Sequence, residues 1–378
     1  MAHVLHISSS FVFSKLYLEL VDALHAFGIK QTIFTPLRKT NINKIVIPEY
    51  LTGQFFSPNL LRYYHSIFFR QRIRDTCQSL IDSIDLSSIT IIHAHFLYTD
   101  GGVALDLYKK FSIPFICTIR NTDLNVYKKY RRDLDPFMHE ILACAKHVVF
   151  LTPSYKEKFL SDLPPALSKV IDAKSVVISN GISPSWLNTV SPRLSQITVK
   201  NPSIQALYVG DFSPNKNLVR LIRAIQLLRN YSFPISLTIV GGWSKKNNFV
   251  NSLYLKFLMS RSWVNYLGRI DDHDYLKTIY QNHDLFLMPS ITETFGLVYL
   301  EALSQGLPVL CSKGQGIDGF FPPNSVVELV NPSSISDIAR GIRCLFYRLD
   351  SVSLMHNDFL HPFLWSHIAK KYLSLYSN

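Results

Sequence analysis

The chain has 378 residues and a mass of 43.3 kDa, which suggests about two domains. Hydrophobic residues make up 47% of it and charged residues 17%, so a large core can form and wholesale disorder is excluded. The formal net charge of +12 is divided evenly, with +6 in residues 1–190 and +6 in residues 191–378. Because the chain has no basic tail and no block of like charge, we expect phosphate-bearing or membrane partners and no nucleic acid.

The cysteines and the apolar runs narrow the class of protein further. Five cysteines, far apart and without a C-x-x-C pair, exclude a disulfide framework and a cysteine zinc site. Residues 1–16 lack the basic and apolar regions of a signal peptide. No run of about 18 apolar residues is present that would span a bilayer. We therefore expect a cytoplasmic protein, with peripheral binding to the cytoplasmic membrane face left open.

Short apolar strands alternate with helical segments in the first half of the chain. The expected strands are residues 4–7, 31–34, 90–94, 114–118, 147–150 and 176–178. Helical periods lie between them, for example at residues 14–27 and 102–111. Residues 183–203 are rich in Ser, Pro and Asn and form the best linker in the chain.

The same pattern restarts after the linker. The expected strands are residues 204–209, 236–240, 264–267, 285–288 and 308–311, and the expected helices are residues 217–229, 248–260, 274–281 and 295–305. This alternation predicts an α/β protein with two doubly wound, Rossmann-like domains that face a cleft. We assign residues 1–185 to the first domain and residues 200–355 to the second. A terminal helix in residues 356–378 is expected to pack back on the first domain.

Three strand ends carry the chemistry, because ligands of doubly wound sheets bind at the carboxyl ends of the strands. The first strand end has Gly210 in the turn and Lys216 before the next helix. Free N–H groups at a helix start favour a phosphate. Lys216 either adds a positive charge for such a phosphate or is a solvated turn residue.

The other two strand ends carry carboxylates and an arginine. Glu293 and Glu301 flank an apolar helix start, where a carboxylate must find a partner or stay exposed. A carboxylate accepts two adjacent hydroxyls such as those of a ribose, and the alternative for Glu301 is an exposed helix stripe. Arg120 either binds a phosphate bidentately or pairs with Asp123 at the surface.

These segments resemble the family 4 glycosyltransferases, retaining enzymes with the two-Rossmann fold called GT-B. The resemblance rests on the spacing of Glu293 and Glu301 with the intervening Phe295-Gly296, and on the Gly210 turn with Lys216-Asn217. Further matching segments are Gly241-Gly242, Gly268-Arg269-Ile270, residues 284–290, His93-Ala94-His95, Gly101 and residues 178–182. The resemblance covers nearly the whole chain and is densest over residues 204–311.

The resemblance implies a role for each matching residue. Lys216 would hold the donor diphosphate, Glu301 the nucleotide ribose, and Glu293 would lie beside the donor sugar. Backbone amides of the Phe295 segment would reach sugar or phosphate, and Arg269 would lie near the base. The implied donor-site residues are Gly210, Lys216, Arg269, Ile270, Phe295, Gly296, Leu297 and Glu301, and the implied catalytic residues are Glu293, Lys216 and Arg120.

The implied reaction is a retaining, metal-independent transfer of a hexosyl group from a UDP- or GDP-sugar to an acceptor hydroxyl. The acceptor would be a glycan, in particular a lipid-linked glycan in cell-surface polysaccharide biosynthesis. The nucleotide sugar is a co-substrate, so neither a cofactor nor a metal ion is expected.

Three positions depart from the family pattern. Asp211 stands where the family usually has arginine, and Arg120-Asn121-Thr122-Asp123 replaces His-Gly-x-Asp. Residues 8–10 are serines in place of a glycine-rich turn. These departures keep an alternative open: a non-catalytic relative that binds a sugar nucleotide or glycan, or a degenerate subunit of a transferase complex.

Two further groups suggest metal ligands. Residues 271–274, Asp-Asp-His-Asp, resemble the Asp-x-Asp of metal-dependent glycosyltransferases, but helix capping explains them better. His93 and His95 share one face of a strand. Because no further ligand cluster accompanies them in the sequence, we interpret them as core or cleft residues.

Residues 54–74 combine four arginines and six aromatic residues with no acid. Apolar residues recur at helical spacing from Leu60 onward. One interpretation is a helix that contacts the inner leaflet or flanks a lipid-linked acceptor. The other is a surface helix whose aromatic side chains pack inward.

Overall fold

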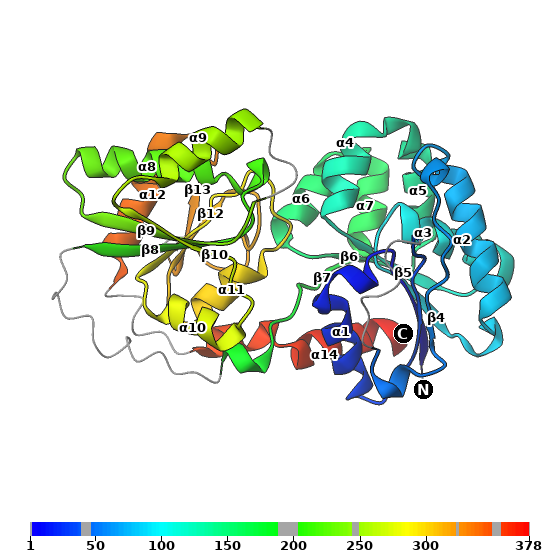
Figure 1. The fold of residues 1–378 in the computed structure, drawn as a ribbon. Helices are drawn as coiled ribbons and strands as arrows, with labels where there is room; N and C mark the ends of the chain where they lie inside the picture. The colour runs from blue at the N-terminus through cyan, green and yellow to red at the C-terminus, as the bar shows by residue number, and fades with distance from the viewer. Residues whose placement is uncertain are drawn as a thin grey trace. The chain divides into compact units, whose positions relative to one another are not determined.

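The computed structural model describes residues 2–38, 47–187, 203–243, 249–322, 325–349 and 357–377. The chain divides into two compact units, each built around a parallel sheet (Figure 1). The first unit comprises residues 1–151, 155–181 and 363–378, and the second comprises residues 152–154 and 182–362.

The first sheet has seven parallel strands in the order β3-β2-β1-β4-β5-β6-β7. Its strands are β1 (His3–Ile7), β2 (Lys30–Phe34), β3 (Phe55–Phe56), β4 (Ile91–Ala94), β5 (Phe115–Ile119), β6 (His147–Phe150) and β7 (Ser175–Val177). The helices that precede residue 182 are α1 (Lys15–His25), α2 (Phe69–Ser83), α3 (Thr99–Phe111), α4 (Lys128–Tyr130), α5 (Asp135–Cys144), α6 (Pro153–Ser161) and α7 (Pro165–Ala173). The chain order reverses between β1 and β4, which is where ligands of such sheets bind.

The terminal helix α14 (Trp365–Ser377) belongs to the first unit and lies beside α1 (Figure 1). The indole Nε1 of Trp365 donates to Glu19 on α1 at 2.8 Å, and Tyr376 lies 2.8 Å from Nδ1 of His93 on β4. A Cβ atom on Gly181 would lie 2.2 Å from the Trp365 ring, so only glycine lets the chain pass there. The last residues of the chain therefore complete the core that its first strand begins.

The second sheet has six parallel strands in the order β10-β9-β8-β11-β12-β13. Its strands are β8 (Ile204–Val209), β9 (Ile235–Val240), β10 (Val264–Gly268), β11 (Leu285–Leu287), β12 (Val309–Ser312) and β13 (Val327–Val330). Its helices are α8 (Leu218–Asn230), α9 (Phe249–Met259), α10 (His273–Gln281), α11 (Leu297–Ser304) and α12 (Ile335–Tyr347). Figure 1 shows α8 and α9 on one face of this sheet and α10 and α11 on the other.

The predicted α/β class with two doubly wound sheets is confirmed. The sequence did not predict the short edge strands β3 and β13. Residues 188–202 of the expected linker lie outside the described residues, and residues 184–186 form a short 3-10 helix. The helix expected from Leu60 is wrong in its first part, because residues 63–66 form a 3-10 helix and α2 begins at Phe69.

Among the described residues, no helix is long and apolar enough to cross a bilayer.

Replacing Trp365 with alanine tests the contribution of α14 to the first unit. Trp365 is buried and keeps its indole hydrogen bond to Glu19, so Trp365→Ala should lower the free energy of unfolding by about 3–5 kcal/mol. Tyr130→Ala, at a side chain that is 68% exposed in the same unit, should change it by less than about 0.5 kcal/mol. Urea denaturation measures both; equal stabilities would show that α14 is not part of this core.

Candidate active site

The strand ends of the second sheet approach each other closely at two glycines. Gly210 follows β8 and donates its N–H to Val240 at the end of β9. Gly241 has a φ of 146°, and a Cβ atom there would lie 1.8 Å from the carbonyl oxygen of Gly210. Only glycine therefore fits position 241, and the Gly210 turn is held against the end of β9.

The turn after Gly210 leads to a 3-10 helix, Pro214–Lys216, and then to Asn217, which begins α8 in a left-handed conformation with φ 61°. Its side-chain amide donates to the carbonyl oxygen of Pro289 after β11 at 2.9 Å and to that of Pro332 after β13 at 2.7 Å. The carbonyl of Asn215 accepts from the N–H of Ile291 at 2.7 Å. These hydrogen bonds join three segments, because Pro289 and Pro332 lie 72 and 115 residues after Asn217 in the sequence.

These hydrogen bonds place Lys216 against Glu293. Nζ of Lys216 forms an ion pair with Oε2 of Glu293, and the two side chains are 22% and 13% exposed. Partial shielding from water strengthens the attraction relative to an ordinary surface pair. The structure thus brings together Lys216 and Glu293, two of the three predicted catalytic residues. In this structure the lysine pairs with a carboxylate of the same chain.

The position of Glu293 depends on residues that the sequence analysis did not assign to the site. Its backbone N–H donates to the side-chain carbonyl of Gln315 at 2.9 Å, and its carbonyl accepts from the N–H of Gly316 at 2.7 Å. Both residues lie in the loop after β12. The glycines of Gly314-Gln315-Gly316 were visible in the sequence, but nothing local indicated that this loop supports Glu293.

The segment after Glu293 turns sharply into α11. Gly296 has a φ of 75°, and a Cβ atom on it would lie 2.5 Å from the Tyr299 ring and 3.1 Å from Cγ of Glu293. Phe295 is buried, and the hydroxyl of Tyr299 donates to Met288 at the end of β11. Gly296 and Leu297 therefore start α11 directly beside the Glu293 side chain, with the helix N-terminus at that strand end.

Glu301 is held by a buried tyrosine. It lies half-buried on α11, and the hydroxyl of Tyr280 on α10 donates to its Oε2 at 3.1 Å. Burial raises the pKa of Tyr280 well above its usual value, and the negative charge of Glu301 raises it further. Tyr280 therefore remains a hydrogen-bond donor. The alternative that Glu301 lies only on an exposed face of its helix is wrong, because the side chain is half-buried and hydrogen-bonded.

Arg269 and Ile270 follow β10 at the edge of the sheet. Arg269 is 77% exposed and pairs with Asp271 at 2.8 Å, while Ile270 is half-buried. Asp272 accepts from the N–H groups of residues 274 and 275 at 2.9 Å, so the predicted helix cap at the start of α10 is confirmed.

Asp211, the first departure from the family pattern, has a local structural role. Its carboxylate accepts from the N–H of Ser213 at 2.7 Å, and its carbonyl accepts from the hydroxyl of Tyr208 at 2.8 Å. An aspartate that closes its own turn in this way is common in tight loops. The carboxylate therefore shapes the turn that leads to Lys216.

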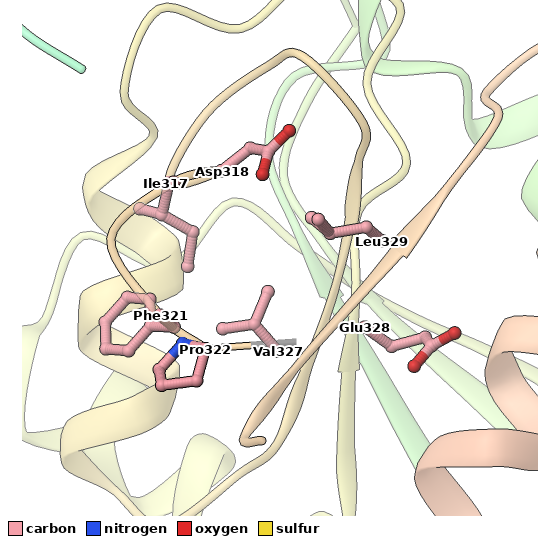
Figure 2. A pocket seen from close by; sticks show the side chains of 8 residues that line it. Ile317, Asp318, Phe321, Pro322, Val327, Glu328 and Leu329 are labelled. Carbon is pink, nitrogen blue, oxygen red and sulfur yellow. The ribbon is translucent and has the colours of Figure 1, made fainter. Parts of the chain in front are cut away.

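Two cavities in the second unit can be compared with the size that a nucleotide sugar needs. One, of about 130 Å³, lies between β13 and the loop after β12 and is lined mainly by apolar side chains (Figure 2). It is too small for a nucleotide sugar, since ligand pockets usually exceed about 300 Å³. The other, of about 420 Å³, adjoins the Lys216 turn and is lined by Ser213, Asn217, Arg220 and Arg223 among others.

In the first unit, Arg120 follows β5 and is only 8% exposed. The carboxylate of Asp123 accepts from its backbone N–H at 2.9 Å, not from its guanidinium. The guanidinium Nε donates to the carbonyl of His95 at 3.1 Å. The expected alternative, a surface pair of Arg120 with Asp123, is therefore wrong.

A third histidine joins His93 and His95, which corrects the expectation that no further ligand accompanies them. One ring nitrogen from each of His6, His93 and His95 lies within 4.8 Å of the other two, and all three rings are buried. Each ring is hydrogen-bonded: His6 to His95 and Gln31, and His93 to Thr118 and Tyr376. We interpret the group as a hydrogen-bonded core cluster, in agreement with the core-packing prediction.

Residues 62–70 form an exposed apolar and basic patch on the first unit. Tyr63, Ile67 and Phe68 are 84%, 74% and 62% exposed, with Arg62 and Arg70 exposed beside them. Buried His65 anchors the segment, because its Nδ1 accepts from the N–H of Arg62 at 3.0 Å and its Nε2 donates to Asp75 at 2.9 Å. The inward-packing alternative is wrong for Tyr63 and Phe68, although Phe69 is buried.

Comparison with known proteins agrees with this geometry. A family model described as Glycosyltransferase Family 4 matches residues 14–186, and one described as Glycosyl transferases group 1 matches residues 192–347. The chain belongs to the family 4 type of glycosyltransferases with the GT-B fold.

Individual relatives are distant in sequence and similar in fold. TuaC of Bacillus subtilis, a glycosyltransferase named for teichuronic acid biosynthesis, is 25% identical over 85% of this chain and 82% of its own. Sucrose-phosphate synthase of Thermosynechococcus elongatus superposes with a TM-score of 0.77 at 21% identity, over 100% of this chain and 98% of that one. HepE of Anabaena, solved in complex with UDP-glucose, superposes with a TM-score of 0.71 at 15% identity, over 100% of both chains.

A matched pair of glycine substitutions tests the close approach of the strand ends. Gly241→Ala puts a Cβ atom on the Gly210 carbonyl and should lower the free energy of unfolding by more than about 2 kcal/mol. Gly242→Ala, where a Cβ atom meets nothing within 4 Å, should change it by less than about 0.5 kcal/mol. Chemical denaturation distinguishes them, and equal losses would contradict the packing described for Gly241.

Proposed function

We propose that this glycosyltransferase moves a sugar from a UDP- or GDP-sugar to an acceptor hydroxyl with retention of anomeric configuration. The observation that carries the proposal is the Lys216–Glu293 pair at the carboxyl edge of the second sheet, beside the start of α11. Doubly wound sheets bind nucleotides at this edge. The UDP-glucose in the HepE structure supports a nucleotide-sugar donor for a chain of the same fold.

The proposed donor site follows from the charges on these strand ends. The donor diphosphate competes with Glu293 for Lys216 and lies near the backbone N–H groups of Gly296 and Leu297. Glu293, released from the lysine, then faces hydroxyls of the donor sugar, while Glu301 and Tyr280 face the ribose. Arg269 and Ile270 lie near the base, and Phe295 holds the turn from the buried side.

In the proposed reaction, the acceptor oxygen forms a bond to the anomeric carbon while the bond from that carbon to the diphosphate oxygen breaks. The acceptor proton passes to the departing diphosphate on the same face of the sugar. Negative charge grows on the diphosphate, and Lys216 stabilises it. No step needs a metal ion in this proposal.

We further propose that the acceptor is a lipid-linked glycan of a cell-surface polysaccharide and binds to the first unit. The similarity to TuaC supports a role in polysaccharide biosynthesis. The patch at residues 62–70 supports peripheral binding at the cytoplasmic membrane face, because aromatic and aliphatic side chains stand among arginines there.

A second candidate function is a non-catalytic relative that binds a sugar nucleotide. Asp211 favours it, because a carboxylate stands where the family usually has a phosphate-binding cation and is used to close the turn. Nucleotide binding without measurable turnover, over a panel of nucleotide sugars and envelope lipid extracts, would support this second function.

Substitution of Lys216 tests the proposed catalytic role. Lys216→Ala should lower kcat/KM by about 100- to 1,000-fold, because it removes a charge aimed at the leaving diphosphate. Glu293→Gln should also reduce transfer strongly while the chain stays folded. Release of nucleoside diphosphate measures the rate. Lys256→Ala, at an exposed position on α9, is the matched control and should retain full activity; a Lys216→Ala enzyme as active as this control would remove the assigned role.

Vesicle binding tests the proposed membrane contact. The double variant Ile67→Glu, Phe68→Glu should bind vesicles containing phosphatidylglycerol at least about tenfold more weakly than the wild type, because it replaces apolar contact with negative charge. Tyr231→Glu, at an aromatic residue 80% exposed in the second unit, is the control. Sedimentation with the vesicles gives the affinities, and equal binding of all three proteins would exclude this patch as the contact.

A further inference from the structure

Arg120 is a buried arginine whose guanidinium has only neutral partners. It is 8% exposed, its Nε donates to the carbonyl of His95 at 3.1 Å, and its Nη1 donates to the side chain of Asn180 at 3.4 Å. Its guanidinium carbon lies 4.9 Å from the centre of the Tyr17 ring. Among the residues that the structure describes, no carboxylate forms an ion pair with it. Buried arginines are otherwise found almost always paired.

Asp123 does not take the place of that missing partner. Its two oxygens accept from the backbone N–H groups of Arg120 at 2.9 Å and Tyr98 at 3.3 Å. Burial raises the pKa of Asp123 to about 6, which these hydrogen bonds and the charge of Arg120 only partly oppose. The hydrogen bonds of the Asp123 carboxylate are therefore made to the loop backbone, and the Arg120 guanidinium has no ion-pair partner among the described residues.

The neighbouring His95 offers a hydrogen-bond acceptor. Gln31 donates its amide to Val21 at 2.9 Å, so its carbonyl accepts from Nε2 of His6 at 3.1 Å. His6 then accepts at Nδ1 from Nε2 of His95 at 3.0 Å. These partners assign Nδ1 of His95 as an unprotonated acceptor, and it is buried without a hydrogen-bond partner among the described residues.

The surroundings keep His95 neutral. Burial lowers the pKa of His95 well below its usual value, and the positive charge of Arg120 lowers it further. The Tyr17 ring packs edge-on against His95, with centroids 5.2 Å apart, and also lies under the guanidinium of Arg120. His95 follows β4 and Arg120 follows β5, and these strands are neighbours in the first sheet. A cation and a hydrogen-bond acceptor therefore lie side by side, both buried, at this carboxyl edge.

We propose that Arg120 binds an anionic group, a carboxylate or a phosphate, of a hydroxyl-bearing substrate at the first unit, and that His95 accepts a hydrogen bond from one of its hydroxyls. The substrate class is thus a sugar acid or a sugar phosphate. The proposal rests on the proposed function only in taking this substrate to be a glycan. It gives the arginine that departs from the family pattern a role in specificity.

Binding of small sugars to the full chain, without any nucleotide donor, tests the proposal. The probes are glucuronate and galacturonate, glucose 1-phosphate and glucose 6-phosphate, and neutral glucose and galactose. The wild type should bind at least one anionic probe about tenfold more tightly than its neutral counterpart, which corresponds to about 1.4 kcal/mol. The uronates and the phosphates, titrated separately by calorimetry, distinguish the two sources of negative charge.

Variants assign the preference to Arg120. Arg120→Gln should abolish the preference for the anionic probe, and Arg120→Lys should keep part of it. Arg132→Gln removes one positive charge from the same unit at a side chain that is 70% exposed, and it should behave as the wild type. Equal affinity of the wild type for anionic and neutral probes overturns the proposal even if Arg120→Gln does not fold, and so does a preference that survives in a folded Arg120→Gln.

The result is separable from the proposed function. An anion preference that depends on Arg120, in a chain that transfers no sugar from any donor, would leave the inference standing and remove the proposed transfer. Transfer to anionic acceptors at an unchanged rate by Arg120→Gln would remove the inference and leave the proposed transfer standing.

Discussion

The side-chain amide of Asn217 is the interaction on which the second unit's site depends. It joins three strand ends, because Asn217 follows β8 and its two acceptors, Pro289 and Pro332, follow β11 and β13. Asn217 has a left-handed backbone conformation at the start of α8, and from this position its amide contacts both acceptors. Without it, Lys216 would be a solvated turn lysine; with it, Lys216 lies against Glu293 at the edge where a doubly wound sheet binds its ligand.

The candidate cations of the two units differ in their partners: Lys216 is paired with a carboxylate and Arg120 is not. In the second unit, Lys216 is paired with Glu293, so in the proposed function an arriving diphosphate replaces one anion on the lysine with another. In the first unit, the guanidinium of Arg120 donates hydrogen bonds only to neutral groups, so in our proposal an anionic substrate group supplies its ion-pair partner. The net charge of +12 therefore says little by itself. What matters chemically is whether a given cation already has an anion.

Much of the fold was predictable from the sequence, because parallel strands buried on both faces appear as short continuous apolar runs. β13 was missed because it contains Glu328, a buried carboxylate that is paired with Arg340 and Arg348 from elsewhere in the chain. No local pattern shows such distant compensation. The helical spacing from Leu60 was misleading for a related reason: the bonds of buried His65 to Arg62 and Asp75 turn the segment outward.

The candidate site was predictable in its residue types and less so in its contacts. The glycine turn, Lys216, Glu293 and Glu301 stand out because their spacing resembles the glycosyltransferase pattern. The support of Glu293 by Gln315, the hold of Tyr280 on Glu301 and the third histidine, His6, come from segments between 20 and 90 residues away. Such contacts exist only once the sheets have formed.

Binding of a nucleoside diphosphate tests the central claim most directly, namely that Lys216 and its surroundings form a diphosphate site. Calorimetric titration of UDP and of GDP into the wild type should show one of them binding with a Kd below about 1 mM, and at least about tenfold weaker binding to Lys216→Ala. Binding of neither nucleotide, or binding that is the same in Lys216→Ala, would contradict the account.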